Sequence, residues 1–98
     1  MYALIVIRYR APIDRIEAAT DAHRAYLRTL AEAGTLLVSG PLVPRTGGVL
    51  VLRVPEGADV HTTLDRVRDG DPFWQQGLAN YELLEWAPTI GRDKLDGL

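Results

Sequence analysis

Three short segments of this chain are apolar at almost every position, and this pattern constrains the fold more than any other feature. The segments are residues 2–7, 35–39 and 48–54. Short runs rich in Val, Ile and Leu, bounded by Gly or Pro, are typical of β-strands. A strand with one face in water alternates apolar and polar residues, so a continuous apolar run predicts burial on both faces.

Two amphipathic segments separate the strands. The apolar spacing predicts a helix from Asp14 to Gly34, in which Asp14 and Glu17 have the spacing of a capping box and Gly34 has the position of a C-terminal glycine. Thr20-Asp21 could mark a break or a second start within this helix. A second, shorter helix is predicted at Val60–Val67, closed by Gly70.

With a last strand at Asn80–Trp86, the predicted order is βαββαβ, an α+β ferredoxin-like fold with a four-stranded antiparallel sheet. Two helices cover only one face of such a sheet, so the other apolar face needs a partner. A second copy of the same sheet is the simplest one, and we expect a homodimer through the sheet faces. The segment from Gly91 to Leu98 looks too polar to cover that face. We expect one domain, residues 1–98, with a core at about 2–87 and a polar tail at 88–98.

Composition narrows the partners and the chemistry. A chain of 98 residues with 47% hydrophobic and 24% charged residues is ordinary for one globular domain. Its net charge of −2 argues against nucleic acid and anionic membranes as partners. The lack of cysteine excludes disulfides and thiolate nucleophiles. No apolar run is long enough to span a bilayer and no signal peptide is evident, so we expect a cytoplasmic protein.

His23 is the most informative residue, because it falls near the middle of the apolar stripe of the first helix, on the face of Ile16 and Leu27. A histidine on a buried face needs hydrogen-bond partners for its ring nitrogens. One interpretation is a core histidine bonded to a backbone carbonyl. The other is a general base, for which a carboxylate would fix the tautomer and strengthen the base.

Asp71 is the natural partner for such a base. It precedes Pro72 at a predicted helix start, so a plain N-cap is the simpler interpretation. Phe73 and Trp74 would wall the site with apolar rings, although such aromatics are more often core residues. His61 points away from the apolar stripe of its helix, so no metal and no cofactor are expected.

Several polar residues could bind a substrate. Ser39 ends an apolar strand and could orient a small molecule, although it lacks the context of a nucleophile. Arg8, Arg10, Arg24 and Arg45 could each hold an anion, but arginine supplies ten of the eleven positive charges, so most must be surface residues.

These motifs, in this order, resemble the YciI-like family (YCII-related domain) of the dimeric α+β barrel superfamily, over about Tyr2 to Trp86. The residues that carry the resemblance are Asp21-Ala22-His23-Arg24-Ala25-Tyr26-Leu27, Glu32-Ala33-Gly34, Ser39-Gly40-Pro41-Leu42, Gly47-Gly48-Val49-Leu50-Val51-Leu52, Asp71-Pro72-Phe73 and Gly77-Leu78.

The resemblance implies a dimer with a pocket beside the sheet, a His–Asp dyad at His23 and Asp71, and a pocket-shaping turn at Gly40-Pro41. Many members carry Arg-Pro just before the Ala-His step, where this chain has Thr20-Asp21. Any role of that arginine in holding an anion is therefore vacant here, or has passed to Arg24 or Arg45.

The sequence thus favours a small cofactor-independent enzyme, in which His23 and Asp71 move a proton on a small cyclic or aromatic molecule, as in isomerisation or elimination. Ser39, Phe73, Trp74 and Arg45 are the expected substrate-binding residues. The alternative is a non-catalytic ligand-binding or accessory module of the same fold. Oxygen chemistry, known elsewhere in the superfamily, has no residue here that argues for it.

Overall fold

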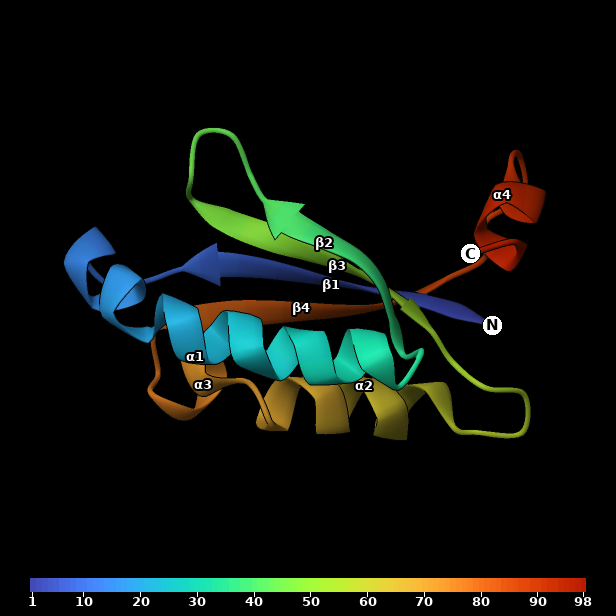
Figure 1. The fold of residues 1–98 in the computed structure, drawn as a ribbon, viewed down its shortest axis with the longest axis horizontal. Helices are drawn as coiled ribbons and strands as arrows, with labels where there is room; N and C mark the ends of the chain where they lie inside the picture. Colours follow the sequence, from blue (N-terminus) through green and yellow to red (C-terminus); the bar gives the residue numbers. More distant parts are fainter.

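The structure, a computed structural model, describes all residues from Met1 to Leu98. A sheet lies between two long helices on one side and a short C-terminal helix on the other (Figure 1). The elements are β1 (Tyr2–Tyr9), α1 (Ile13–Glu32), β2 (Leu36–Pro41), β3 (Gly47–Arg53), α2 (Val60–Asp69), α3 (Pro72–Gln75), β4 (Ala79–Trp86) and α4 (Arg92–Asp96).

The four strands form one antiparallel sheet in the order β2-β3-β1-β4. The two most apolar strands, β1 and β3, lie at its centre, where Ile5 pairs with Leu50 on one side and Leu83 on the other. This arrangement confirms the predicted ferredoxin-like α+β fold. A bulge between Leu36 and Val38 shifts the register of the edge strand β2.

The core fills the space between the sheet and the helices. Alternate residues of β1, including Ile5 and Ile7, point toward α1 and α2 and are almost fully buried. They meet Ile16 from α1 and Leu64 from α2, which are equally buried. Full burial of one such aliphatic side chain contributes roughly 1.5–3 kcal/mol, so this layer supplies most of the driving force for folding.

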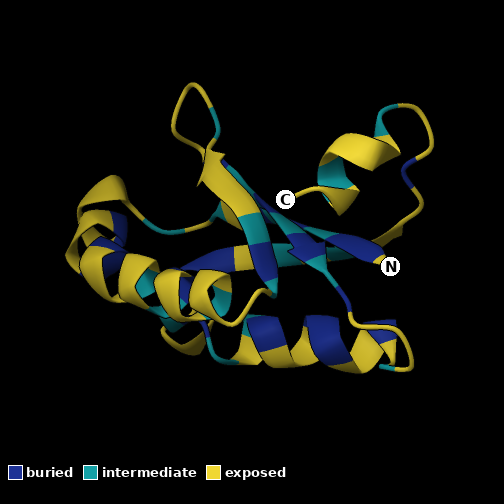
Figure 2. Ribbon diagram, turned by 45° about the vertical axis from the view of Figure 1, so that its right-hand side comes forward, coloured by how far each residue is buried: buried dark blue, intermediate teal, exposed yellow.

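The opposite face of the sheet is apolar but only half covered. By alternation it carries Leu4 and Val6 of β1 and Val51 of β3, all half-buried, with Val38 54% and Leu84 37% exposed. The sequence predicted burial on both faces, but in this single chain burial is complete only for the residues that face the helices. Figure 2 shows buried and half-buried segments along the central strands.

The C-terminal tail folds back onto one end of this open face, which the sequence analysis did not expect. The Tyr2 hydroxyl hydrogen-bonds to the Asp96 carboxylate, and the Arg53 guanidinium donates to the carbonyls of Leu95 and Leu98. Tyr2 is only 3% exposed as a result. The polar tail docks through charged and hydrogen-bonding groups, so its polarity does not prevent contact with the sheet (Figure 1).

The predicted capping box at Asp14 and Glu17 is wrong. Helix α1 begins at Ile13 after Pro12, which occupies the cap position with φ −56° and ψ 148° and offers no side-chain hydrogen bond. Proline there sets the backbone for the first turn, and Asp14 instead sits within that turn, where the helix dipole favours a negative charge. The helix runs on without a break at Thr20, and Gly34 follows it with φ +81°, as expected.

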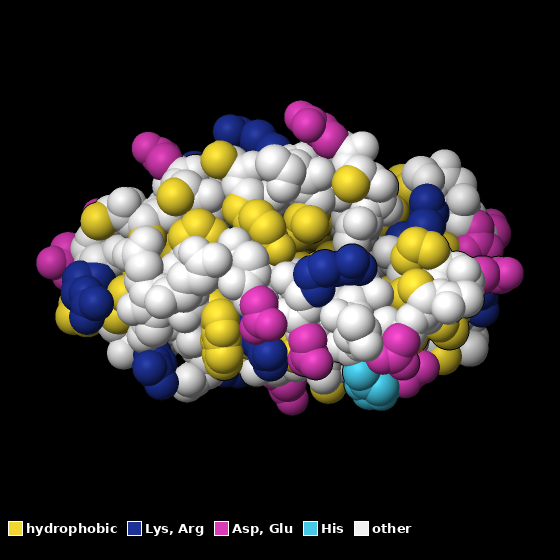
Figure 3. Space-filling model, turned by 90° about the horizontal axis from the view of Figure 1, so that it is seen from below, with side chains coloured by type: hydrophobic (Ala, Val, Ile, Leu, Met, Phe, Trp, Pro, Cys, Tyr) yellow, Lys and Arg dark blue, Asp and Glu magenta, His cyan; other side chains and the backbone are white.

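Acidic, basic and apolar side chains are intermixed on the helical face, where no patch of a single charge dominates (Figure 3). No helix combines the length and the apolar character needed to cross a lipid bilayer.

Candidate active site

His23 and Asp71 form a buried pair between α1 and α3. Nδ1 of His23 lies 2.8 Å from Oδ1 and 3.0 Å from Oδ2 of Asp71. The side chains are 13% and 1% exposed, respectively. An ionised carboxylate only accepts hydrogen bonds, so we assign the proton to Nδ1, which leaves the lone pair of Nε2 free. The contact predicted from the sequence is present in the structure.

Asp71 is also the N-cap of α3. Its Oδ1 accepts a hydrogen bond of 3.0 Å from the backbone N–H of Phe73, and Pro72 occupies the first helical position. The helix cap and the hydrogen-bond partner of His23, which the sequence analysis treated as competing interpretations, are therefore one and the same carboxylate. Its orientation is fixed by the turn that it caps.

Phe73 holds the imidazole from one side. The rings of His23 and Phe73 are stacked, with centroids 4.0 Å apart and an interplanar angle of 8°. The edge of Tyr9 meets Phe73 at 5.8 Å and 85°. Phe73 is 1% exposed, so this apolar wall keeps water from one face of the histidine.

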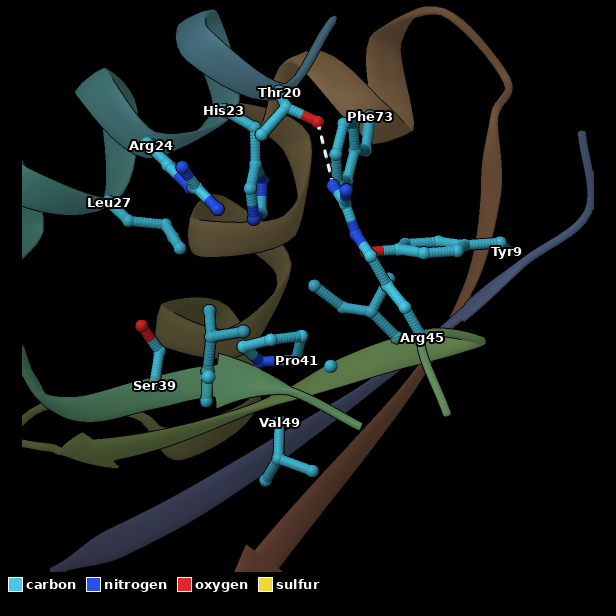
Figure 4. A pocket seen from close by; sticks show the side chains of 14 residues that line it. Tyr9, Thr20, His23, Arg24, Leu27, Ser39, Pro41, Arg45, Val49 and Phe73 are labelled. Carbon is cyan, nitrogen blue, oxygen red and sulfur yellow. Dashed lines mark hydrogen bonds between the residues drawn. The ribbon is translucent and has the colours of Figure 1, made fainter. Parts of the chain in front are cut away.

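His23 borders a cavity of about 160 Å³ between α1 and the sheet, with Asp71 buried behind it. His23 and Arg24 point from α1 toward Ser39 and Pro41 on β2, while Arg45 enters from the β2–β3 loop (Figure 4). An apolar cavity of about 150 Å³ in another protein is large enough to hold benzene. The space beside His23 therefore has the size of a single ring.

Two guanidinium groups, of Arg24 and Arg45, line this cavity, and no carboxylate does. Arg45 donates a 2.9 Å hydrogen bond to the hydroxyl of Thr20 and lies 5.9 Å from the Tyr9 ring. Neither arginine takes part in any ion pair of the structure. Of the four arginines that the sequence offered for an anion, these two reach the cavity, whereas Arg8 and Arg10 do not.

Trp74 does not line the cavity, which corrects its assignment as a substrate-binding residue. Successive residues of a helix point about 100° apart, so α3 turns Phe73 inward and Trp74 outward. Its indole is 40% exposed, meets the edge of Tyr81 at 5.7 Å and lies under the Arg68 guanidinium at 4.6 Å. Ser39, Phe73 and Arg45 do line the cavity.

Sequence reasoning missed two tyrosines near Asp71. Burial, and then the charge and hydrogen bonding of Asp71, raise the pKa of Tyr81 far above its ordinary value. The Tyr81 hydroxyl is buried and makes no hydrogen bond of ordinary geometry, so its interaction with Asp71 is weak. Burial and the charge of Asp71 also raise the pKa of Tyr26, whose hydroxyl donates to the Val67 carbonyl at 2.7 Å. The only sequence signal was an aromatic residue on an inward-facing position of each element.

His61 does not line the cavity. Its side chain is 77% exposed, with Nε2 3.9 Å from the Glu85 carboxylate, as expected of a surface residue. No group of three or more His, Asp or Glu side chains is arranged to hold a metal ion.

The fold and this pocket define a ferredoxin-like domain with a histidine-lined cavity beside the sheet. The model of the YCII-related domain family matches residues 1–87, and the chain belongs to that family. No curated protein matches the sequence.

Among solved structures, the chain is similar to 5-chloro-2-hydroxyhydroquinone dehydrochlorinase (TftG) from Burkholderia phenoliruptrix AC1100, in complex with 2,5-dihydroxybenzoquinone. The TM-score is 0.74 at 22% sequence identity, over 92% of this chain and 97% of that one. The two proteins share the fold.

Proposed function

We propose that this protein is a small cofactor-independent enzyme that transfers a proton on a small cyclic or aromatic molecule, by isomerisation or elimination. The observation that carries the proposal is that His23, hydrogen-bonded to Asp71, borders a cavity of about 160 Å³. A base held in one tautomer beside a ring-sized space is the minimum that proton abstraction requires.

In the proposed step, Nε2 of His23 takes a proton from a carbon next to a carbonyl, or from a ring hydroxyl. The electron pair of the broken bond moves into the ring. In an elimination it expels a leaving group such as chloride, and in an isomerisation the proton returns at another carbon. Asp71 stabilises the imidazolium that forms, and no electrons are gained or lost overall.

Ser39 and Arg45 would orient the substrate, and Phe73 would keep water from the base. The similarity to TftG supports the proposal, since that protein is a dehydrochlorinase of a chlorinated hydroquinone with a quinone bound. The exposed guanidinium groups of Arg24 and Arg45 would favour a phenolate or another ring anion.

The test is a turnover assay on chlorinated hydroquinones, phenols and lactones with the wild type, His23→Ala and the matched control His61→Ala. Removal of a general base lowers turnover by about 10²–10⁴-fold. We expect this loss in His23→Ala with the fold intact, and wild-type turnover in His61→Ala. An active His23→Ala protein would contradict the proposal. Binding without turnover in the wild type would favour a non-catalytic binding module.

We further propose that the domain, residues 1–98, forms a homodimer through the open face of its sheet. The half-buried Leu4, Val6 and Val51 support this, because apolar side chains on one sheet face gain by excluding water. Helix α4 would then flank the interface at the Tyr2 end. A cytoplasmic location stays a prediction from the sequence.

A further inference from the structure

A second hollow lies next to the cavity at His23. It has a volume of about 280 Å³ and lies between the C-terminal half of α1 and the edge strand β2. Arg24, Leu27 and Ser39 line both spaces, so the two are adjacent. They lie side by side along α1, and His23 lines the first of them.

The second hollow has an apolar lining with a basic rim. Its helix residues Arg24, Leu27, Arg28 and Ala31 are spaced by three or four positions, so they form one stripe of α1. Five of its eight lining residues are hydrophobic, the charged ones are both arginines, and neither Arg24 nor Arg28 is in an ion pair.

The two spaces would hold different parts of one ligand. The cavity at His23 has room for one ring. A substituent on that ring, directed past Leu27 and Ser39, would enter the second hollow and lie against Leu36 and Leu37. A chain of methylenes suits this lining because it needs no hydrogen bonds, while Arg24 and Arg45 in the first cavity suit a negative charge on the ring.

We infer that the substrate class is an amphipathic ring anion, a phenolate or carboxylate-bearing ring with an apolar chain that lies between α1 and β2. This inference rests on the proposed function, because it takes the ring to sit at His23. It goes further in assigning the groove of Leu27, Ala31, Leu36 and Leu37 to the chain of the substrate.

The test compares benzoate, 4-butylbenzoate and the uncharged 4-butylbenzyl alcohol by calorimetry on the full chain. Each buried methylene tightens binding about fourfold, so partial burial of the butyl chain predicts a gain of about tenfold over benzoate. The alcohol should bind more weakly than 4-butylbenzoate, since it lacks the charge that would face Arg24 and Arg45 in the cavity at His23.

The variant Ala31→Glu places a carboxylate in the groove and should abolish the butyl gain while benzoate binding is kept. The matched control is Ala25→Glu, an exposed position of α1 that lines neither space, and it should leave the gain unchanged. The ratio should also persist in His23→Ala, because His23 does not line the groove.

Equal affinities for benzoate and 4-butylbenzoate would overturn the groove inference, whether the groove is shallow in solution or covered by a second copy. The proposed function would stand in that case, provided that His23→Ala loses turnover. If the butyl gain is found but His23→Ala remains active, the proposed enzyme mechanism fails and the groove inference stands as a binding site. Failure of the wild type to bind either acid would overturn the ring-anion assignment itself.

Discussion

The imidazole of His23 lies parallel to the phenyl ring of Phe73, with centroids 4.0 Å apart, while the backbone N–H of the same Phe73 donates to Asp71. One buried residue of α3 therefore positions both members of the pair, the base through its ring and the carboxylate through its backbone. Substitutions of this side chain leave the backbone contact in place, so the two effects can be separated by experiment.

Phe73→Leu should remove the stacking and keep the cap. The loss of a buried aromatic ring with partial refilling lowers the free energy of unfolding by roughly 1–3 kcal/mol. We also expect turnover to fall, because the imidazole loses its apolar support. Urea denaturation and the turnover assay measure the two effects. Trp74→Leu is the control, since Trp74 lies outside the cavity, and equal losses of turnover in both variants would refute a specific role of the stacking.

Asp71→Asn and Asp71→Ala separate the cap from the charge. Asparagine caps a helix as well as aspartate does, whereas alanine at a cap costs about 1 kcal/mol. Both variants should lose turnover, and Asp71→Ala should be the less stable. Nitrogen-15 shifts of the His23 ring should report the Nδ1–H tautomer in the wild type and a mixture in Asp71→Asn. A wild-type tautomer and full turnover in Asp71→Asn would rule out the dyad.

Asp59 offers the matched control for that experiment. It caps α2 through a 2.9 Å hydrogen bond from the Thr62 N–H, and it lies away from the cavity. Asp59→Ala should therefore destabilise the fold without changing turnover at a temperature where the protein stays folded. Loss of turnover in Asp59→Ala would mean that the assay measures the loss of folded protein and not a specific effect at the site.

Gly70→Ala should destabilise the protein although the backbone there suits any residue. Gly70 has φ −82°, so conformation does not require glycine, but an added Cβ would lie 2.5 Å from the Tyr26 hydroxyl. Overpacking of this kind costs about 1–3 kcal/mol. In a Tyr26→Leu background the same change should be neutral or stabilising. Additive effects in this double-mutant cycle would contradict the close approach.

The stability of the fold should fall at alkaline pH because of Tyr81. Its pKa in the folded state is raised above the ordinary 10.0, so above pH 10 the unfolded chain releases this proton while the folded one keeps it. The contribution of this raised pKa to the free energy of unfolding is fully present below pH 10. It is lost as the pH rises, by at most about 1.4 kcal/mol per pH unit. Urea unfolding of the wild type and Tyr81→Phe between pH 9 and about 11 checks this, and parallel curves would refute it.

Much of the site followed from the sequence because its parts are local. Helical spacing placed His23 on the inward face of α1, and the Asp-Pro step placed Asp71 at a helix start. Helix geometry separates Phe73 and Trp74 by about 100°, but which of the two points inward was not predictable in this way, because packing against the core decides it.

Contacts between segments that are distant in the sequence could not be predicted either. Nothing local distinguishes Arg45, which reaches Thr20 across the cavity, from Arg10, which donates to the Gly77 carbonyl. The docking of α4 likewise depends on Arg53 and Tyr2, which lie far from it in the sequence. Patterns of apolar residues carry no information on such polar contacts.

The cavity is built from two kinds of residue. Ile7, Leu50 and Phe73 are buried in the core, whereas Ser39, Pro41 and Arg45 on the opposite wall are exposed. Changes on the exposed wall therefore cost little stability, while changes at the buried wall disturb the fold itself. Selection in the laboratory can therefore vary the exposed wall to alter which molecules fit, while the buried wall, on which the fold depends, is left unchanged.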